Sequence, residues 1–179
     1  MGSTSFFQPK PKTNCVRFLC DFRNLNRQFK RKPYPMPKMR EIILNLEVFQ
    51  YARSLDLNMV YYRISINNQA SNLCTIILPW GKYKYKRLPM GICNSPDIFQ
   101  EKMNKMFCGF EFIRAYIKNL LIIAKGHWSD HLNKLEQVLK NIEDNRIKWN
   151  VEKSFFGQTQ MGYLGFLVTW NGIRPVNKN

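Results

Sequence analysis

The sequence predicts an α+β fold in which an antiparallel sheet is covered by helices on one face. Beyond residue 53 the expected elements follow the order strand, hairpin, helix, hairpin, helix, hairpin. Paired strands with helices interspersed between them are typical of this class. No internal repeat or linker divides the 179 residues, and 45% of them are hydrophobic, so the chain is long and apolar enough for a packed core.

The first 46 residues are expected to form only short secondary-structure elements. Residues 1–14 are expected to form a flexible lead-in, and residues 16–22 (VRFLCDF) have strand character. The prolines of residues 33–37 (PYPMP) predict an extended connector. A short amphipathic helix is expected next, because apolar residues recur at i, i+3, i+4 and i+7, namely Met39, Ile42, Ile43 and Leu46.

The middle of the chain is expected to be rich in strands. Residues 53–57 (RSLDL) and 61–66 (YYRISI) are strand candidates, and residues 74–78 and 82–88 predict a hairpin around Pro79-Trp80-Gly81. A helix should then begin at Ser95-Pro96-Asp97. That tripeptide offers a capping serine, a proline for the first helical position and an acid near the positive end of the helix dipole.

The last third predicts two more hairpins separated by a helix. Residues 115–125 (AYIKNLLIIAK) form two apolar arms joined by Lys118-Asn119, and Ser129-Asp130 opens a helix. Its apolar stripe consists of Leu132, Leu135, Val138, Leu139 and Ile142. Tyr163 to Thr169 is predicted as one strand, and Asn171-Gly172 is a hairpin signal that leads into a return arm at Ile173-Arg174.

The charge of the chain favours a polyanionic partner. Lys and Arg number 28 against 12 Asp and Glu, a formal charge of +16, and nucleic acid is the simplest partner for such a protein. In KYKYKR, Lys82, Lys84 and Lys86 fall on one face of a strand, followed by Arg87, and tyrosines fall on the other. A cationic face backed by aromatics suits a nucleic-acid backbone, and lysines that protect an exposed edge strand from aggregation are the alternative.

The sequence disfavours a membrane protein, a disulfide-rich protein and a protein with a metal site of Cys or His residues. The longest apolar run, Leu120 to Ala124, is far shorter than the roughly 20 residues that cross a bilayer, so no membrane partner is expected. Five cysteines without a C-x-x-C pattern suggest neither a disulfide framework nor a zinc site; they indicate reduced thiols in an intracellular protein of the cytoplasm or nucleus. His127 and His131 have helical spacing, but without further ligands nearby they indicate a helix start rather than a metal site.

Several long motifs resemble those of reverse transcriptases, most closely the enzymes of gypsy-type LTR retrotransposons. The motifs are RFLCDFRNLN, KPYPMP, SLDL, LPWGKYKYKRLPMGICNSPDIFQEKM, AYIKNLLIIAKG and YLGFLVTWNGIRP, in the order typical of that family. The resemblance implies a fingers-and-palm fold over residues 15–179, without thumb, connection or RNase H domains. The palm would be an antiparallel sheet backed by helices.

The resemblance also implies roles for particular residues. In active members three aspartates hold two magnesium ions for phosphoryl transfer. Asp56 matches the first aspartate, and Tyr61 matches the aromatic gate that crowds a ribose 2′-hydroxyl. Arg17 matches an arginine that meets the incoming triphosphate. Met90 and Gly91 match the loop under the nucleotide and template, although retroviral relatives often carry a hydrogen-bonding glutamine at the position of Met90.

The family's Y-x-D-D tetrapeptide is altered here. It reads Tyr116-Ile117-Lys118-Asn119, so both aspartates are missing and one has become a cation. Asp56 and Lys118 together carry no net charge, whereas three aspartates carry −3 against the +4 of two magnesium ions. We therefore expect polymerase chemistry to be lost or severely impaired and no metal to be bound, with Asp56 a vestigial ligand. We also expect Lys118 to turn toward Asp56 and pair with it.

Three functions follow from these observations. The chain could be a reverse-transcriptase-derived domain that has lost catalysis and keeps its affinity for RNA or an RNA/DNA duplex. It could instead be a structural scaffold in a larger RNA or protein assembly. The third hypothesis, an active RNA-directed DNA polymerase, needs another acid to replace the missing pair, and Glu111 is the nearest upstream candidate.

Overall fold

The computed structural model describes residues 2–11, 15–44, 46, 49–169 and 172–176. The chain divides into two compact units, each made of two separate stretches. The first unit contains residues 1–34 and 61–99, and the second contains residues 35–60 and 100–179.

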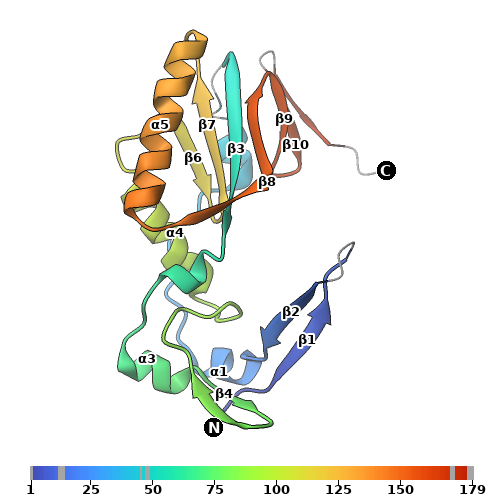
Figure 1. The fold of residues 1–179 in the computed structure, drawn as a ribbon, viewed down its shortest axis with the longest axis vertical. Helices are drawn as coiled ribbons and strands as arrows, with labels where there is room; N and C mark the ends of the chain where they lie inside the picture. Colours follow the sequence, from blue (N-terminus) through green and yellow to red (C-terminus); the bar gives the residue numbers. More distant parts are fainter. Residues whose placement is uncertain (1, 12–14, 45, 47–48, 170–171, 177–179) are drawn as a thin grey trace. The chain divides into compact units, whose positions relative to one another are not determined.

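A four-stranded antiparallel sheet is the centre of the second unit. Its order is β6-β7-β3-β8, with β3 at Tyr51–Asn58, β6 at Ile113–Tyr116, β7 at Asn119–Ala124 and β8 at Lys148–Gln158. Helix α5 (Trp128–Asp144) lies along the β6–β7 side of this sheet (Figure 1). Residues Leu120 to Ala124 are all buried, as expected for an inner strand that is covered on both faces.

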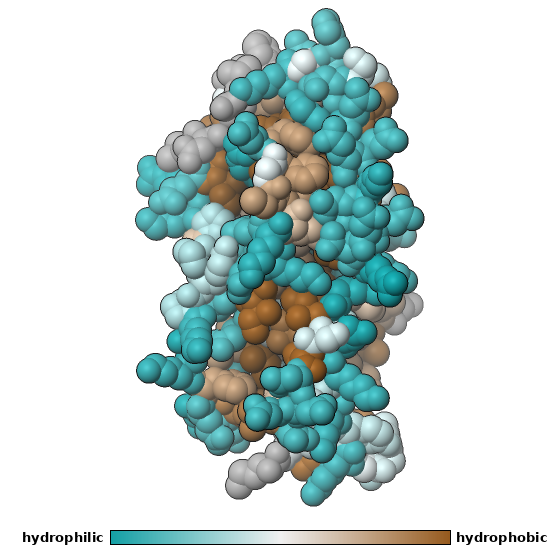
Figure 2. Space-filling view, turned by 90° about the vertical axis from the view of Figure 1, so that its left-hand side faces the viewer, coloured by the Kyte–Doolittle hydropathy of each residue, from teal (hydrophilic) through white to brown (hydrophobic). Residues whose placement is uncertain are grey.

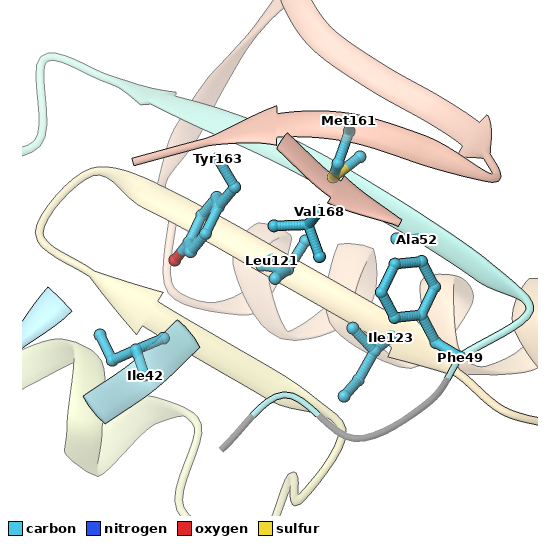
Figure 3. Close-up of a cluster of buried hydrophobic side chains, with 8 residues drawn as sticks. All are labelled: Ile42, Phe49, Ala52, Leu121, Ile123, Met161, Tyr163 and Val168. Carbon is cyan, nitrogen blue, oxygen red and sulfur yellow. The ribbon is translucent and has the colours of Figure 1, made fainter. Parts of the chain in front are cut away.

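A second, three-stranded meander closes the core of this unit. It consists of β9 (Gln160–Tyr163), β10 (Phe166–Thr169) and β11 (Gly172–Pro175), in the order β11-β10-β9. Figure 3 shows the apolar cluster that β3 and β7 form with β9, β10 and helix α2 (Met39–Leu44). Its buried members are Ile42, Phe49, Ala52, Leu121, Ile123, Met161, Tyr163 and Val168.

The first unit is built from two hairpins and short helices. One hairpin pairs β1 (Ser5–Pro9) with β2 (Val16–Cys20), and the other pairs β4 (Thr75–Leu78) with β5 (Gly81–Lys84). The helices are α1 (Arg23–Gln28), the 3-10 turn η1 (Tyr61–Arg63) and α3 (Asn68–Leu73). A smaller core of Phe22, Cys74, Ile76 and Ile92 joins them. Helix α4 (Ser95–Met106) begins in this unit and ends in the second.

The expected α+β class is confirmed, but the flexible lead-in is wrong for part of residues 1–14. Residues 5–9 form β1, which pairs with the predicted strand at residues 16–20. Pro9 stands at the end of β1, opposite Val16, where a missing N–H does least harm to the ladder. The pairing was missed because five residues with two prolines nearby carry little strand signal until their partner is known.

Two predicted strands are also wrong. Tyr61 begins a 3-10 turn rather than a strand, and its ring packs edge-on against Phe99 with centroids 5.8 Å apart. The predicted strand from Tyr163 to Thr169 is split by a turn in which Leu164 and Gly165 have φ values of 50° and 86°. Two successive positive φ values make a tight hairpin turn, and Gly165 was the signal for it.

Strand β8 was not predicted at all. Its sequence, KWNVEKSFFGQ, does not alternate cleanly, because its pairing with β3 shifts register twice, between Ala52 and Ser54 and again between Ser54 and Asp56. Helices α1 and α3 were missed too, although Asn67 caps α3 by accepting a hydrogen bond from the Ala70 N–H at 2.8 Å.

The helices predicted near residues 39, 95 and 129 are present, as are the hairpins at residues 75–84 and 113–124. Ser95 differs from its expected capping role. Its hydroxyl donates to the Pro89 carbonyl at 2.8 Å. The return arm at Ile173-Arg174 is β11, whereas Asn171 of the predicted turn and the side chain of Ile43 lie outside the described residues.

Hydrophilic side chains cover most of the face drawn in Figure 2, and apolar side chains gather in smaller areas between them. Within the described ranges, no helix is long and apolar enough to span a membrane.

Candidate active site

The hairpin between β6 and β7 places Lys118 and Asn119 beside Asp56. In the β3–β7 ladder Asp56 is directly opposite Asn119, and the Leu57 N–H donates to the Lys118 carbonyl at 2.8 Å. Ile117 adopts φ 48° at the turn. Asp56, Lys118 and Asn119 therefore meet at one end of the sheet.

Lys118 forms an ion pair with Asp56, as predicted. Its Nζ lies 2.8 Å from Asp56 Oδ2, and the two side chains are 49% and 19% exposed. A pair with one half-exposed partner adds little to stability, in the range of about 0–1 kcal/mol. Its importance is chemical, because an ammonium group is bonded to the one carboxylate that the family pattern leaves at this site.

The Gln100 side chain holds the backbone of the β6–β7 hairpin in place, a role that was not predicted from the sequence. This fully buried side chain of α4 accepts a hydrogen bond from the Ile117 N–H at 2.7 Å and donates to the Ala115 carbonyl at 3.1 Å. Tyr163 adds a hydroxyl donor to the Arg114 carbonyl at 3.1 Å. A buried glutamine in an amphipathic helix was the available signal, since a polar group in a core needs partners.

On the other side, β8 supports Asp56. The Asp56 N–H donates to Ser154 Oγ at 3.2 Å, and that hydroxyl donates in turn to the Asn150 carbonyl at 2.6 Å. Asn150 is also opposite Asp56 in the ladder. These bonds satisfy the irregular backbone where the β3–β8 register shifts.

The donor set at this end of the sheet does not fit a pair of magnesium ions. Mg²⁺ prefers several hard anionic oxygens, and Asp56 offers one carboxylate whose Oδ2 is bonded to Lys118. Among the described residues, no group of three or more His, Cys, Asp and Glu side chains is placed to hold a metal ion.

Glu111 does not replace the missing acids. The β6–β7 ladder pairs Tyr116 with Asn119 at the turn and Ile113 with Ile122 at the far end. Glu111 precedes Ile113, so it is separated from the turn by more than the length of β6, about 10 Å at 3.3 Å per residue. It lines a cavity together with Phe112 and Arg114.

The predicted nucleotide-binding residues all lie in the first unit, whereas Asp56 lies in the second. Arg17 is exposed on β2, opposite Gln8, and Met90 is 38% exposed. Tyr61 is half-buried, and burial raises the pKa of its phenol. These residues keep their assignments as predictions.

Gly91 occupies a backbone position that favours glycine. Its φ is 102°, and an added Cβ would lie 3.5 Å from the Phe22 ring. Asn26 clamps this loop, because its side chain donates to the Gly91 carbonyl at 2.8 Å and accepts from the Cys93 N–H at 2.9 Å. Asn26 was not predicted, since the contact joins residues 65 positions apart.

The four basic residues that are predicted to bind nucleic acid, on β5 and just after it, are exposed. Lys84 Nζ donates to the Asn72 side-chain oxygen at 2.7 Å, and Arg87 bonds the Ser65 hydroxyl. Lys82 and Lys86 are also exposed. The tyrosines that were predicted on the opposite face of this strand differ from each other. Tyr85 packs against the core of the first unit, whereas Tyr83 is 46% exposed.

The chain matches the family described as reverse transcriptase (RNA-dependent DNA polymerase) over residues 8–168. It belongs to the reverse transcriptase family. It is 30% identical over 176 residues to the retrovirus-related Pol polyprotein from transposon gypsy of Drosophila melanogaster, and 29% identical over 164 residues to that from transposon 297. These alignments cover 97% and 90% of this chain. The chain spans only 16% and 15% of those relatives.

Solved structures support the same fold for this reverse transcriptase domain. The foamy viral protease-reverse transcriptase in complex with an RNA/DNA hybrid superposes with a TM-score of 0.89, at 22% identity, over 98% of this chain and 24% of that one. Its complex with double-stranded DNA gives a TM-score of 0.91 at the same identity and the same share of this chain, and 37% of that chain. Following the names that the family resemblance implies, we call the second unit the palm and the first unit the fingers.

A buried pair beneath the palm sheet makes its stability sensitive to acid. Arg53 Nε of β3 donates to His131 Nε2 of α5 at 2.6 Å, and both side chains are buried. The histidine must therefore be neutral. Burial and the Arg53 charge lower the pKa of His131 from 6.5 to about 4, against a smaller opposing effect of Asp130. Lys134 also faces this imidazole and adds to the lowering.

The His131 pKa predicts a loss of stability in mild acid. A histidine whose folded pKa is depressed stabilises the fold fully above its unfolded pKa of 6.5, and this contribution decreases as the pH falls toward 4. Urea unfolding between these pH values should show a loss on the order of 3 kcal/mol. His131→Gln should remove most of this dependence, and the exposed His127→Gln should keep it. Equal pH profiles for both variants would show that His131 is not responsible.

Proposed function

We propose that this chain is a retrotransposon-type reverse transcriptase domain that has lost the polymerase reaction and retains affinity for nucleic acid. The observation that carries the proposal is the ion pair between Lys118 Nζ and Asp56 Oδ2 at 2.8 Å. It places a cation against the remaining carboxylate, where the family chemistry requires a divalent metal. Primer extension on an RNA template, with Mg²⁺ and with Mn²⁺, tests the loss of activity.

Retained binding is supported by charge and by the structural relatives. The relatives were solved with an RNA/DNA hybrid and with double-stranded DNA. In this chain the fingers unit contains 13 Lys and Arg against 2 Asp, a net charge of +11 out of the total of +16. A surface of that sign attracts a phosphate backbone regardless of base sequence.

With five cysteines that form no disulfide among the described residues, we place the protein inside the cell.

Binding should weaken steeply with salt. If Lys82, Lys84, Lys86 and Arg87 each contact one phosphate of a single strand, affinity should fall about 50-fold between about 50 and 200 mM salt, because each contact releases condensed counterions. Fluorescence anisotropy with a labelled oligonucleotide measures this slope. As a matched control, replacing the exposed Lys148 and Lys153 of β8 with alanine should leave the slope unchanged. Affinity that does not vary with salt would contradict the proposal.

A scaffold role in a larger assembly is the second candidate. It is favoured by Val151 and Phe155, which are 63% and 54% exposed on β8, an edge strand of the palm sheet. Exposed apolar side chains on a sheet edge are a liability unless a partner covers them. Purification from the native source, followed by identification of what is bound, distinguishes a protein partner from RNA.

A further inference from the structure

The turn of the β4–β5 hairpin exposes a large aromatic side chain. Trp80 is 69% exposed, and Tyr83 on the adjoining strand is 46% exposed. Within the described part of the chain, the Trp80 indole makes no hydrogen bond or ring contact. Trp128 and Trp149 differ, because they pack against Tyr51 and Phe156 with centroids 5.1 and 5.7 Å apart. Trp80 therefore contributes little to the core and is available to a ligand.

The turn that carries this indole is short and lies between two paired strands. The ladder pairs Leu78 with Gly81 and Ile77 with Lys82, which leaves only Pro79 and Trp80 in the turn. The outer edge of β4 is covered at Ser3, whose N–H donates to the Thr75 carbonyl at 2.8 Å and whose carbonyl accepts from the Ile77 N–H at 3.0 Å. A short turn on a paired hairpin presents a side chain with little loss of conformational entropy on binding.

The charges around this turn select the kind of partner. Residues 57–96 contain five basic residues, Arg63, Lys82, Lys84, Lys86 and Arg87, and no Asp or Glu. Lys82 and Lys84 lie on β5 directly after the turn and are exposed. The hydrogen bond of Lys84 Nζ to Asn72 is to a neutral amide oxygen and not to a carboxylate. An apolar protein partner would have to bury these charges, whereas a nucleic acid neutralises them.

An exposed indole beside lysines suits unpaired bases. Bases in a duplex are stacked on each other and offer no free face, whereas single-stranded bases stack on aromatic side chains regardless of sequence. We propose that Trp80 is a base-stacking residue and that the β4–β5 hairpin is a contact site for single-stranded nucleic acid, with Lys82 and Lys84 meeting its phosphates. This inference rests on the proposed nucleic-acid binding and names the residues and the strand state that it involves.

The test compares single-stranded and duplex oligonucleotides of one sequence by fluorescence anisotropy. Trp80→Ala should weaken single-strand binding by about 5- to 150-fold, the range for loss of one stacked base, and change duplex binding by less than about twofold. Trp80→Phe should retain most of the single-strand affinity. Phe7→Ala, which removes another exposed aromatic from the same unit, is the matched control and should have no effect on either ligand.

The other outcomes are distinguishable. If wild-type and Trp80→Ala proteins bind the single strand equally well and with the same salt slope, this inference is wrong while the proposed function stands. If the wild-type protein binds neither oligonucleotide, both are wrong. If Trp80→Ala weakens both ligands equally, Trp80 does not distinguish single strands and the stacking role is overturned. Replacing Lys82 and Lys84 with alanine should weaken both ligands and reduce the salt slope by about 1.4 for the single strand.

Discussion

Replacing Lys118 and Asn119 together with aspartate is expected to raise the affinity of the chain for Mg²⁺ or Mn²⁺ by about a hundredfold or more. An ammonium group about 4 Å from a divalent ion is repelled by roughly 8 kcal/mol at an effective dielectric of about 20. Screening and side-chain movement reduce this, but even a third of it, about 2.7 kcal/mol, corresponds to about a hundredfold in affinity. The substitution also gives Asp56 two neighbouring carboxylates on a hairpin whose backbone already lies beside it.

Calorimetric titration with Mn²⁺ measures this change directly, and wild-type protein should give no primer extension with either metal. Lys118→Ala removes the cation without adding a ligand, so it should recover only part of the gain. Asn133→Asp with Lys140→Asp, at two exposed positions of α5, makes the same change of −3 in net charge away from the site. That control should leave metal affinity unchanged. Extended primer from the wild-type protein would overturn the proposed loss of activity.

Gln100→Ala is expected to lower the free energy of unfolding of the palm by about 2–4 kcal/mol. The substitution leaves the Ile117 N–H and the Ala115 carbonyl without their partner, and each buried unsatisfied group costs about 1–3 kcal/mol. It also removes a fully buried side chain from α4. The hairpin that carries Lys118 should therefore lose its fixed geometry along with stability.

Urea unfolding monitored by circular dichroism measures this effect. Gln137→Ala is the matched control, because Gln137 is an exposed glutamine of α5 and its loss should stay within about 0.5 kcal/mol. If the two variants unfold at the same urea concentration, Gln100 does not support the hairpin in the way that its hydrogen bonds indicate.

Local sequence patterns were enough to predict many of the helices and strands of this fold. The helices near residues 95 and 129 and the hairpin at residues 113–124 were predicted correctly, because helix starts, apolar stripes and a polar turn between apolar arms are encoded within a few residues. Strand β8 and the pairing of β1 with β2 were missed. In β8 the register shifts disturb the alternation, and in β1 the evidence for a strand is its partner rather than its own sequence.

The sequence by itself determined the family, the α+β class, the excess of positive charge and the loss of both hairpin aspartates. Each of these depends on which residues are present and in what order. The sequence also predicted the ion pair between Lys118 and Asp56, 62 positions apart, which the structure confirms. Tertiary structure alone decided that Gln100 and Asn26 hold the backbone of the hairpin and of the Gly91 loop, and that Trp80 is left exposed. The reason is physical: hydrogen bonds, ion pairs and burial depend on distances between residues far apart in the chain, and those distances exist only once the strands have paired.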